Sequence, residues 1–381
     1  MRRIGEFILV FLIVLAFFYM KPVVLSQRSP NSVEELVVNE VKPQTKSNQQ
    51  NELNATGLAT IIGLSEKQLK EKMPNPKNEW VVGIDKKWLV YGDKNTDYYQ
   101  VELTDDKVSS VFVLGTKVDV SPFSMDMTLG DISEITTIYP NFEFDYRDKK
   151  YEIELTEDDM NYRPLIAFDN GTFALLHFNY DTGKLLGVRY VSKSTLVEMI
   201  PYQLNEEVFL QPVELTDEQW NQFNQANTEQ MFTILNIMRE RVNRKPYKLD
   251  AELALESKKA LEEFNADPKL VIKKEERLDQ WQEKVDSSNP SDSFILVDEE
   301  LERLLKLGKP IDKGTHGLFV QSMGDVPFIV SNWFVNRFDQ QEINDAKDEY
   351  IGIAFNKNQV LVLFNQKAVN TSLTTESSDK K

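Results

Sequence analysis

The residue types that most often carry chemistry are scarce in this sequence. The chain has no cysteine and only two histidines, His177 and His316, which stand far apart. The lack of cysteine excludes disulfides, thiol catalysis and cysteine-ligated zinc. Two distant histidines also rule out a zinc motif built from closely spaced imidazoles. The sequence contains no Gly-x-Ser-x-Gly elbow, phosphate-binding loop or dinucleotide fingerprint. It therefore indicates no catalytic residue, no metal ligand and no cofactor site.

Two runs of carboxylates could be mistaken for acid–base pairs. They are Glu157-Asp158-Asp159 and Asp298-Glu299-Glu300. Both stand in predicted turns or at a predicted helix start, where acidic side chains cap the helix and favour its positive end. We interpret both runs as structural.

The stretch from Trp333 to Phe355, WFVNRFDQQEINDAKDEYIGIAF, has the layout of a frame for an active site. It begins like the end of a helix, passes through a loop and finishes as a strand, yet its middle holds no His, Cys or Ser. Asp339 is the one residue in it with chemistry, because a carboxylate can bind calcium together with other oxygens. The alternative, which we favour, is a solvated loop carboxylate beside Gln340 or an N-cap for a turn at Glu342.

Two other residues are candidates for the wall of a cleft. Trp333 is predicted to lie in the core or in the cleft wall. His316 is a candidate cleft residue, although a lone histidine is more often structural or exposed.

Length and charge limit the classes of partner. With 381 residues the chain is longer than one ordinary domain, which predicts two folded units and connectors. Apolar residues make up 41% of it and charged residues 28%, enough to build real cores. The net charge of −17 disfavours nucleic acids and anionic lipid surfaces as partners.

Residues 1–25, MRRIGEFILVFLIVLAFFYMKPVVL, predict a signal-anchor that crosses the membrane. The arginines at its start place the N-terminus inside and the rest of the chain outside the cell. We therefore expect a single-pass cell-membrane protein that touches the membrane through this helix only. The alternative is secretion after signal cleavage.

Five segments follow from the patterning along the chain. Residues 26–57 form a polar, flexible stalk after the anchor. Residues 58–203 contain an internal duplication, in which Val101–Leu114 and Phe178–Val191 superpose without a gap as strand, polar turn and strand. In each half a short helix precedes the strands, with Ser65 and Asp131 as expected N-caps.

Residues 216–365 are predicted to be a second domain. Three helices are expected, the first capped near Thr216, the second with Leu249 and Leu253 facing inward, and the third starting at Asp298. A terminal hairpin turns at Asn356-Lys357-Asn358. Helices packed on an antiparallel sheet give an α+β protein whose second domain is an α/β/α sandwich. Residues 366–381 are predicted to be a disordered tail.

At two segments the sequence resembles bacterial members of the CAP superfamily, the cysteine-rich secretory, antigen 5 and pathogenesis-related proteins. ILNIMRERVNRKPYKLDAELALESKKA resembles the first two helices of that domain, and Trp333, Ile343 and Ile351-Gly352 keep the spacing of its last segment. The duplicated region is similar to the CAP-associated N-terminal domain that precedes CAP domains in Gram-positive (Firmicutes) proteins. The resemblance implies the CAP fold for the second domain.

The departures from the family pattern concern the cleft. CAP domains typically line it with two histidines and two acidic residues, a set able to hold a divalent metal. Here Asp339 stands where the family has a histidine, and Asn336 where it has a serine. The stretch that begins at His316 lacks the expected glutamate. The resemblance therefore implies a degenerate cleft, and no catalytic or metal residue is carried over.

These observations lead to two hypotheses about function. The first, which we favour, is a membrane-tethered extracytoplasmic protein whose CAP domain is a non-catalytic binding or scaffolding module of the cell envelope. Its expected partner is an envelope protein or a cell-wall component, without nucleic acid and without a cofactor. The alternative is a ligand-binding or metal-assisted hydrolytic role in a remodelled cleft, which needs convergent polar groups around Asp339 and His316.

Overall fold

The computed structural model describes residues 51–206, 208, 214–286, 294–307, 314–321, 324–345 and 347–367. The predicted signal-anchor at residues 1–25, nearly all of the stalk and nearly all of the tail lie outside these ranges. Within them, no helix combines the length and the apolar character needed to cross a bilayer.

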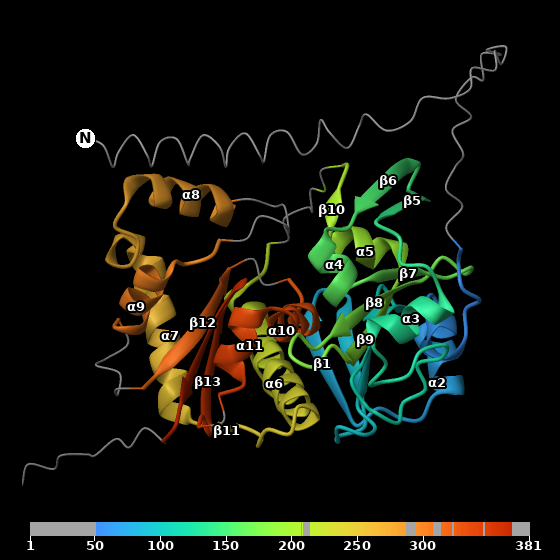
Figure 1. Cartoon of the computed structure of the whole chain (residues 1–381). Coiled ribbons are helices and arrows are strands. Elements are labelled where there is room, and N and C mark those ends of the chain that lie inside the picture. The colour runs from blue at the N-terminus through green and yellow to red at the C-terminus, as the bar shows by residue number, and fades with distance from the viewer. Residues whose placement is uncertain are drawn as a thin grey trace, which may run out of the picture. The chain divides into compact units, whose positions relative to one another are not determined.

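The first half of the described chain is built on a seven-stranded antiparallel sheet (Figure 1). The strands lie in the order β1-β2-β3-β4-β9-β8-β7. Their bounds are β1 Asn78–Gly83, β2 Lys86–Tyr91, β3 Tyr99–Thr104, β4 Lys107–Val113, β7 Leu165–Ala167, β8 Phe173–Phe178 and β9 Leu185–Val191. Four short helices accompany them: η1 Gly57–Ile61, α2 Glu66–Lys72, α3 Leu129–Ile135 and α5 Lys193–Met199.

The two segments that superpose in the sequence, Val101–Leu114 and Phe178–Val191, occupy corresponding places in this sheet. Each forms an antiparallel hairpin with one irregularity in its register, β3–β4 and β8–β9, and the hairpins meet where β4 pairs with β9. An isolated antiparallel β-bridge ties the helix before each hairpin to that hairpin. The bridge pairs Ser65 with Lys107 in the first half of the duplication and Thr128 with Lys184 in the second. Ser65 caps α2 as expected, but the N-cap of α3 is Thr128. Asp131 is instead the third helical residue, where its carboxylate completes a capping box.

A small sheet packs against the large one, with Phe142 and Phe144 in contact with Phe173 of β8. Its order is β10-β6-β5, with β5 Asn141–Tyr146, β6 Lys149–Glu154 and β10 Gln203–Leu204. Helix α4, Glu157–Tyr162, follows β6 and is capped by Thr156. The acidic run at residues 157–159 is therefore the first turn of a helix, as the sequence predicts.

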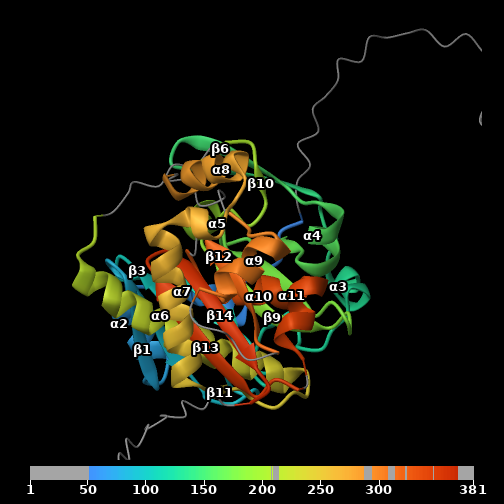
Figure 2. The same cartoon turned by 90° about the vertical axis from the view of Figure 1, so that its left-hand side faces the viewer.

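The second half is built on a four-stranded sheet with the order β11-β13-β14-β12. Its strands are β11 Lys248–Leu249, β12 His316–Gln321, β13 Tyr350–Asn356 and β14 Gln359–Asn365. The helices around it are α6 Asp217–Arg241, α7 Ala251–Ala266, η2 Pro268–Leu270, α8 Glu275–Asp286, α9 Asp298–Leu305, α10 Val326–Val335 and α11 Arg337–Ile343. Figure 2 shows α7 lying across β13 and β14.

Several predicted details of this half are confirmed. Thr216 caps α6, α9 begins at Asp298, and β13 and β14 are joined by the predicted turn. Gly352 is required by close packing, because a Cβ atom there would lie 2.3 Å from the carbonyl carbon of Leu253 on α7. The inward placement expected for Leu249 is wrong, since this residue is 56% exposed on the short edge strand β11.

The two halves share one hydrophobic core, which differs from the two folded units expected from length. Helix α6 lies between the two sheets and contacts both β1 and β13 (Figure 1). One continuous cluster of buried side chains joins the large sheet to α6, α10, β13 and β14, and it includes Trp80, Trp88, Phe112, Leu235, Trp333, Phe334 and Phe364. The described residues accordingly all belong to a single compact unit.

Candidate functional site

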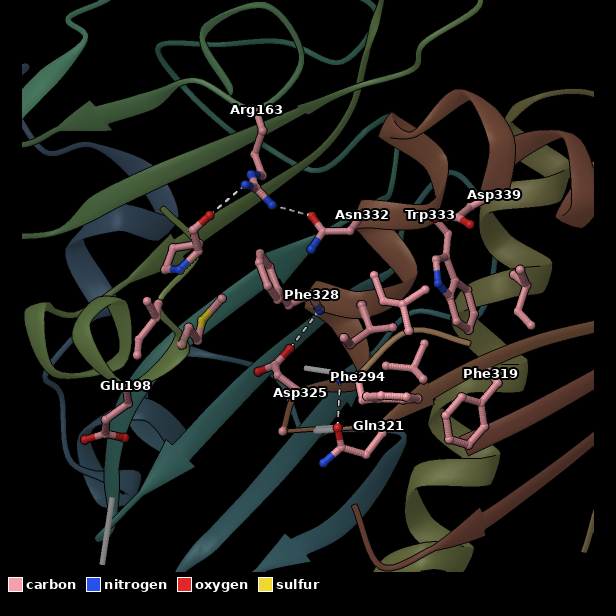
Figure 3. A pocket seen from close by; sticks show the side chains of 18 of the residues that line it. Arg163, Glu198, Phe294, Phe319, Gln321, Asp325, Phe328, Asn332, Trp333 and Asp339 are labelled. Atoms are coloured by element: carbon pink, nitrogen blue, oxygen red, sulfur yellow. Dashed lines mark hydrogen bonds between the residues drawn. The ribbon is translucent and has the colours of Figure 1, made fainter. Parts of the chain in front are cut away.

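A cavity of about 490 Å³ lies between the two halves of the described chain (Figure 3). The second half supplies residues of β12, α10 and α11 to it, together with Phe294 and Ile295. The first half supplies Lys86 of β2, Arg163 after α4, and the C-terminal end of α5. The walls are mainly aromatic and aliphatic, with a few charged groups between them.

A buried ion pair joins the two halves beside the cavity. The side chain of Arg189, on β9, is fully buried and donates to both carboxylate oxygens of Asp325, the N-cap of α10. Its Nη2 to Oδ2 distance is 2.7 Å, and its Nε donates to Ser110 Oγ at 2.9 Å. Although burial alone would raise the pKa of Asp325, the Arg189 guanidinium holds it below its usual range. The pair therefore fixes the start of α10 against the large sheet.

Arg163 makes a second link across the same boundary. Its Nη1 donates to Asn332 Oδ1 of α10 at 2.6 Å, and its Nη2 donates to Asp159 Oδ1 and to the carbonyl oxygen of Pro201 (Figure 3). The guanidinium also lies over the ring of Phe328, 5.3 Å from its centroid. Both links hold cavity walls from the two halves in a fixed relation.

Asp339 lies at the cavity wall near Trp333 (Figure 3). It is neither a loop residue nor an N-cap: Asn336 caps α11, and Asp339 is the third residue of that helix. The expectation of a solvated loop carboxylate is therefore wrong, because α11 begins earlier than the sequence suggests and turns this side chain inward. Burial, with a smaller contribution from the charge of Glu342, raises the pKa of Asp339 to about 6.

His316 lies close to the cavity but does not line it. On β12, its Nε2 is 2.7 Å from Asp348 Oδ2 and its Nδ1 is 2.5 Å from Glu342 Oε2. Burial alone would lower the pKa of this imidazole, but the hydrogen bonds to Asp348 and Glu342 raise it to about 9. The imidazole is thus held as a cation between two carboxylates. One of these carboxylates, Glu342, is also the group whose charge acts on Asp339.

The structure brings the three sequence candidates into one region in different roles. Trp333, 4% exposed, contributes both to the shared core and to the cavity wall. Asp339 faces the cavity and His316 supports α11 from β12. Sequence reasoning missed Arg163, Arg189 and Asp325. Only Asp325 carried a local signal, since an Asp two residues before Pro327 is typical of a helix start.

The metal set that the family resemblance implies does not fit the residues present. In the part of the chain that the structure describes, no group of three or more His, Cys, Asp or Glu side chains could hold a metal ion. Both nitrogens of His316 are engaged by carboxylates, which leaves no lone pair free for a metal.

Comparison with known proteins identifies a family model for the first half and one similar membrane protein. The family model described as CAP-associated N-terminal matches residues 62–202. An uncharacterized membrane protein of Bacillus subtilis, YlbC, is 23% identical over 214 residues, which are 56% of this chain and 61% of that protein. The match thus spans less than two thirds of the relative's length.

Two solved structures share the fold. A cysteine-rich secretory protein from Staphylococcus aureus is 24% identical with a TM-score of 0.65, and the alignment covers 84% of this chain and 98% of that one. An extracellular protein containing an SCP domain, from Bacillus anthracis, is 20% identical with a TM-score of 0.61, covering 87% of this chain and 100% of that one. These likenesses establish the architecture of both halves, a mixture of helices and antiparallel sheets.

Proposed function

Because the chain belongs to the CAP superfamily and carries a CAP-associated N-terminal domain over residues 62–202, we propose that it is a non-catalytic binding module of the cell envelope. The cavity between the two halves is its ligand site. The observation that carries the proposal is the make-up of that cavity: aromatic and aliphatic walls, a carboxylate that faces the open space, and no His, Cys or Ser among the described residues that line it.

The alternative hydrolytic function receives less support from the same site. A general base at neutral pH needs a pKa near that pH, and an imidazole must have a free nitrogen to accept a proton. His316 has a pKa of about 9 and both nitrogens face carboxylates, so it is protonated under those conditions. Asp339 has no nucleophile beside it among the described residues that line the cavity.

Filling the cavity tests the proposal. The full-length chain is used to capture partners from envelope extracts, beside Ile329→Trp, which places a large ring in the cavity. Leu255→Trp is the matched control, because Leu255 is exposed on α7 and does not line the cavity. We expect Ile329→Trp to lose the captured partner and Leu255→Trp to retain it. Equal capture by both variants would place the binding surface elsewhere.

Membrane tethering is the second part of the proposal. It is supported by the similarity to YlbC, which is described as a membrane protein, and by the apolar sequence of residues 1–25. Deleting residues 2–25 should move the chain from the membrane fraction to the soluble fraction. In intact cells whose wall has been removed, external protease should digest the full-length chain. Protection of the chain would mean that its bulk faces the cytoplasm.

A further inference from the structure

The cavity between the two halves is open to solvent. Ile295 lines it and is 73% exposed, and the side chains of Glu198 and Asp339 in its wall are both partly exposed. A small molecule or a long side chain can therefore enter it from solvent.

Most of the cavity wall is apolar. Leu318 and Val320 of β12 form one part of it, and Phe328, Ile329 and Trp333 of α10 form another. Contact with such a wall releases water from apolar surface, so it favours a ligand with an aliphatic or aromatic part.

The cations at the cavity are already neutralised. Two of them line it and a third, Arg189, lies beside it. Each is paired with a carboxylate: Lys86 with Glu102 at 3.4 Å, Arg163 with Asp159 at 2.7 Å, and Arg189 with Asp325. These pairs leave no free positive charge for the other carboxylates of the wall.

Two carboxylates of the wall remain, Glu198 and Asp339. Glu198 accepts a hydrogen bond from Ser194 Oγ at 2.8 Å and acts on the already paired Lys86. For the side chain of Asp339, the described residues supply neither a hydrogen-bond donor nor a cation. Asp339 is thus a half-buried carboxylate without a counterion.

His316 does not serve as that counterion. Its two nitrogens face Glu342 and Asp348, and Glu342 adds its own negative charge to the surroundings of Asp339. Burial and this charge together raise the pKa of the Asp339 carboxyl group, so the site disfavours the ionised carboxylate.

These features select the charge of the ligand. A neutral apolar ligand would bury the carboxylate further without a partner, which costs free energy, and an anionic ligand would be repelled. A cation at Asp339 removes this cost, and Trp333 supplies an aromatic ring to the same part of the wall (Figure 3). Because no metal-ligand cluster is found in the described part of the chain, an organic cation fits better than a metal.

From the apolar wall, its access to solvent and the unpaired carboxylate, we propose that the cavity binds an alkylammonium group, with the aliphatic stem against α10 and β12 and the ammonium at Asp339. This rests on the proposed binding function and specifies its ligand. The same chemistry occurs in a free aliphatic amine and in the lysine side chain of a partner protein, whose stem packs on apolar surface while its charged end pairs with a carboxylate.

The test measures the binding of pentylamine by isothermal titration calorimetry. The full-length protein is held in nanodiscs of zwitterionic lipid, and nanodiscs without protein are the blank. Pentan-1-ol is the matched probe, because it keeps the stem and lacks the charge. We expect pentylamine to bind about tenfold more tightly than pentan-1-ol. Equal affinities would overturn the proposal.

Two variants locate the ammonium. Asp339→Asn should weaken the binding of pentylamine by about tenfold and leave that of pentan-1-ol unchanged. Asp279→Asn is the matched control, because Asp279 is an exposed carboxylate on α8 that does not line the cavity, and it should have no effect. Unchanged binding of pentylamine to Asp339→Asn would show that the ammonium lies elsewhere and that the proposal is wrong.

A third probe separates the two sources of the ligand. Nα-acetyl-lysine N-methylamide carries the ammonium on a four-carbon stem between two blocked peptide groups. If it binds as well as pentylamine and with the same loss in Asp339→Asn, the lysine side chain of a partner fits the site. If only pentylamine binds, the ligand is a free amine. Failure of both probes to bind contradicts the proposal.

The outcome is separable from the test of the proposed function. If Ile329→Trp abolishes partner capture but neither ammonium probe binds the wild type, the cavity is a ligand site for another chemistry and the alkylammonium inference is wrong. If Ile329→Trp loses pentylamine but keeps partner capture, the cavity takes the cation and the proposed function fails.

Discussion

His316 and Asp339 are placed on neighbouring elements and both interact with Glu342, yet the fold shifts their protonation for opposite reasons. For His316 the two carboxylate partners outweigh burial and favour the charged form. For Asp339 burial is the larger effect and Glu342 adds to it, so the neutral form is favoured. At the residue scale, these shifts become stability differences that depend on pH.

His316 should stabilise the fold below neutral pH and lose that effect in mild alkali. Its folded pKa of about 9 is above the ordinary value of 6.5, so the stabilisation is complete below pH 6.5 and is lost as pH rises through 9. We expect the free energy of unfolding to fall by about 1–2 kcal/mol across this window, discounted for partial solvent screening. Urea unfolding of the wild type and His316→Gln checks this, and the variant should lack the slope.

Proton NMR gives an independent check on the same group. Burial lowers the pKa of His177 well below 6.5, so only one of the two histidine signals should titrate in mild alkali. A His316 signal that titrates near its ordinary value would contradict the two carboxylate contacts.

Asp339→Asn should stabilise the protein at neutral pH. The folded pKa of about 6 exceeds the ordinary value of 3.8, so the folded state binds the proton more tightly and stability falls as pH rises between these values. Removing the carboxylate should raise the free energy of unfolding by about 1 kcal/mol at neutral pH and by less near pH 4. Thermal unfolding at the two pH values measures the difference. A destabilised variant at neutral pH would show that Asp339 has a cation partner.

At the scale of elements, the position of α10 decides the shape of the cavity. The helix contributes Phe328, Ile329, Asn332 and Trp333 to the wall, and its first turn is held by Asp325. Asp325 has two structural roles: it pairs with the buried Arg189, and it accepts a hydrogen bond from the amide of Phe328 at 2.8 Å. Of the contribution that Asp325 is expected to make to the free energy of unfolding, helix capping accounts for the smaller part.

Asp325→Ala should therefore be one of the more damaging single substitutions. It leaves a fully buried guanidinium without its main partner, which costs about 3–5 kcal/mol of unfolding free energy. The matched control is Thr156→Ala, which removes only the N-cap of α4 and should cost about 1 kcal/mol. Denaturant unfolding of both variants distinguishes the two effects. Equal losses would mean that the Arg189 contact adds nothing beyond capping.

At the scale of the whole molecule, the shared core makes the two halves interdependent. Three links tie the first half to α6: Gln230 donates to Gln100 at 2.6 Å, Trp80 donates to Glu229 at 3.2 Å, and Arg241 donates to the carbonyl of Leu186 at 2.8 Å. Together with the apolar cluster around α6, these contacts hold both sheets against one helix.

Unfolding should consequently occur as one transition rather than two. Leu235→Ala, a fully buried position on α6, should lower the single midpoint by removing about 2–5 kcal/mol of stability. Tryptophan fluorescence reports on both halves, through Trp80 and Trp88 in one and Trp281 and Trp333 in the other. Coincident fluorescence and circular dichroism transitions would support one cooperative unit. Two separated transitions, with only the later half affected by Leu235→Ala, would contradict it.

Local patterning in the sequence was enough to identify the elements whose signals are contained within a few residues. The caps at Ser65 and Thr216, the start of α9 at Asp298 and the terminal hairpin depend on neighbouring side chains and on turn chemistry, so they can be read from the chain alone. The spacing of Trp333, Ile343 and Ile351-Gly352 likewise indicated the CAP architecture. The absence of cysteine and the scarcity of histidine exclude disulfides, thiol catalysis and closely spaced zinc motifs whatever the fold.

Only the tertiary structure decided what surrounds these residues. Arg189 and Asp325 are 136 residues apart in the sequence, Arg163 and Asn332 are 169 apart, and His316 and Asp348 are 32 apart, and such pairings leave no local periodicity. The inward turn of Asp339 depends on where α11 packs, and the place of β12 at the end of the sheet depends on which strands pair. The site is thus built from long-range contacts, because burial and charge pairing are properties of the packed molecule rather than of any one segment.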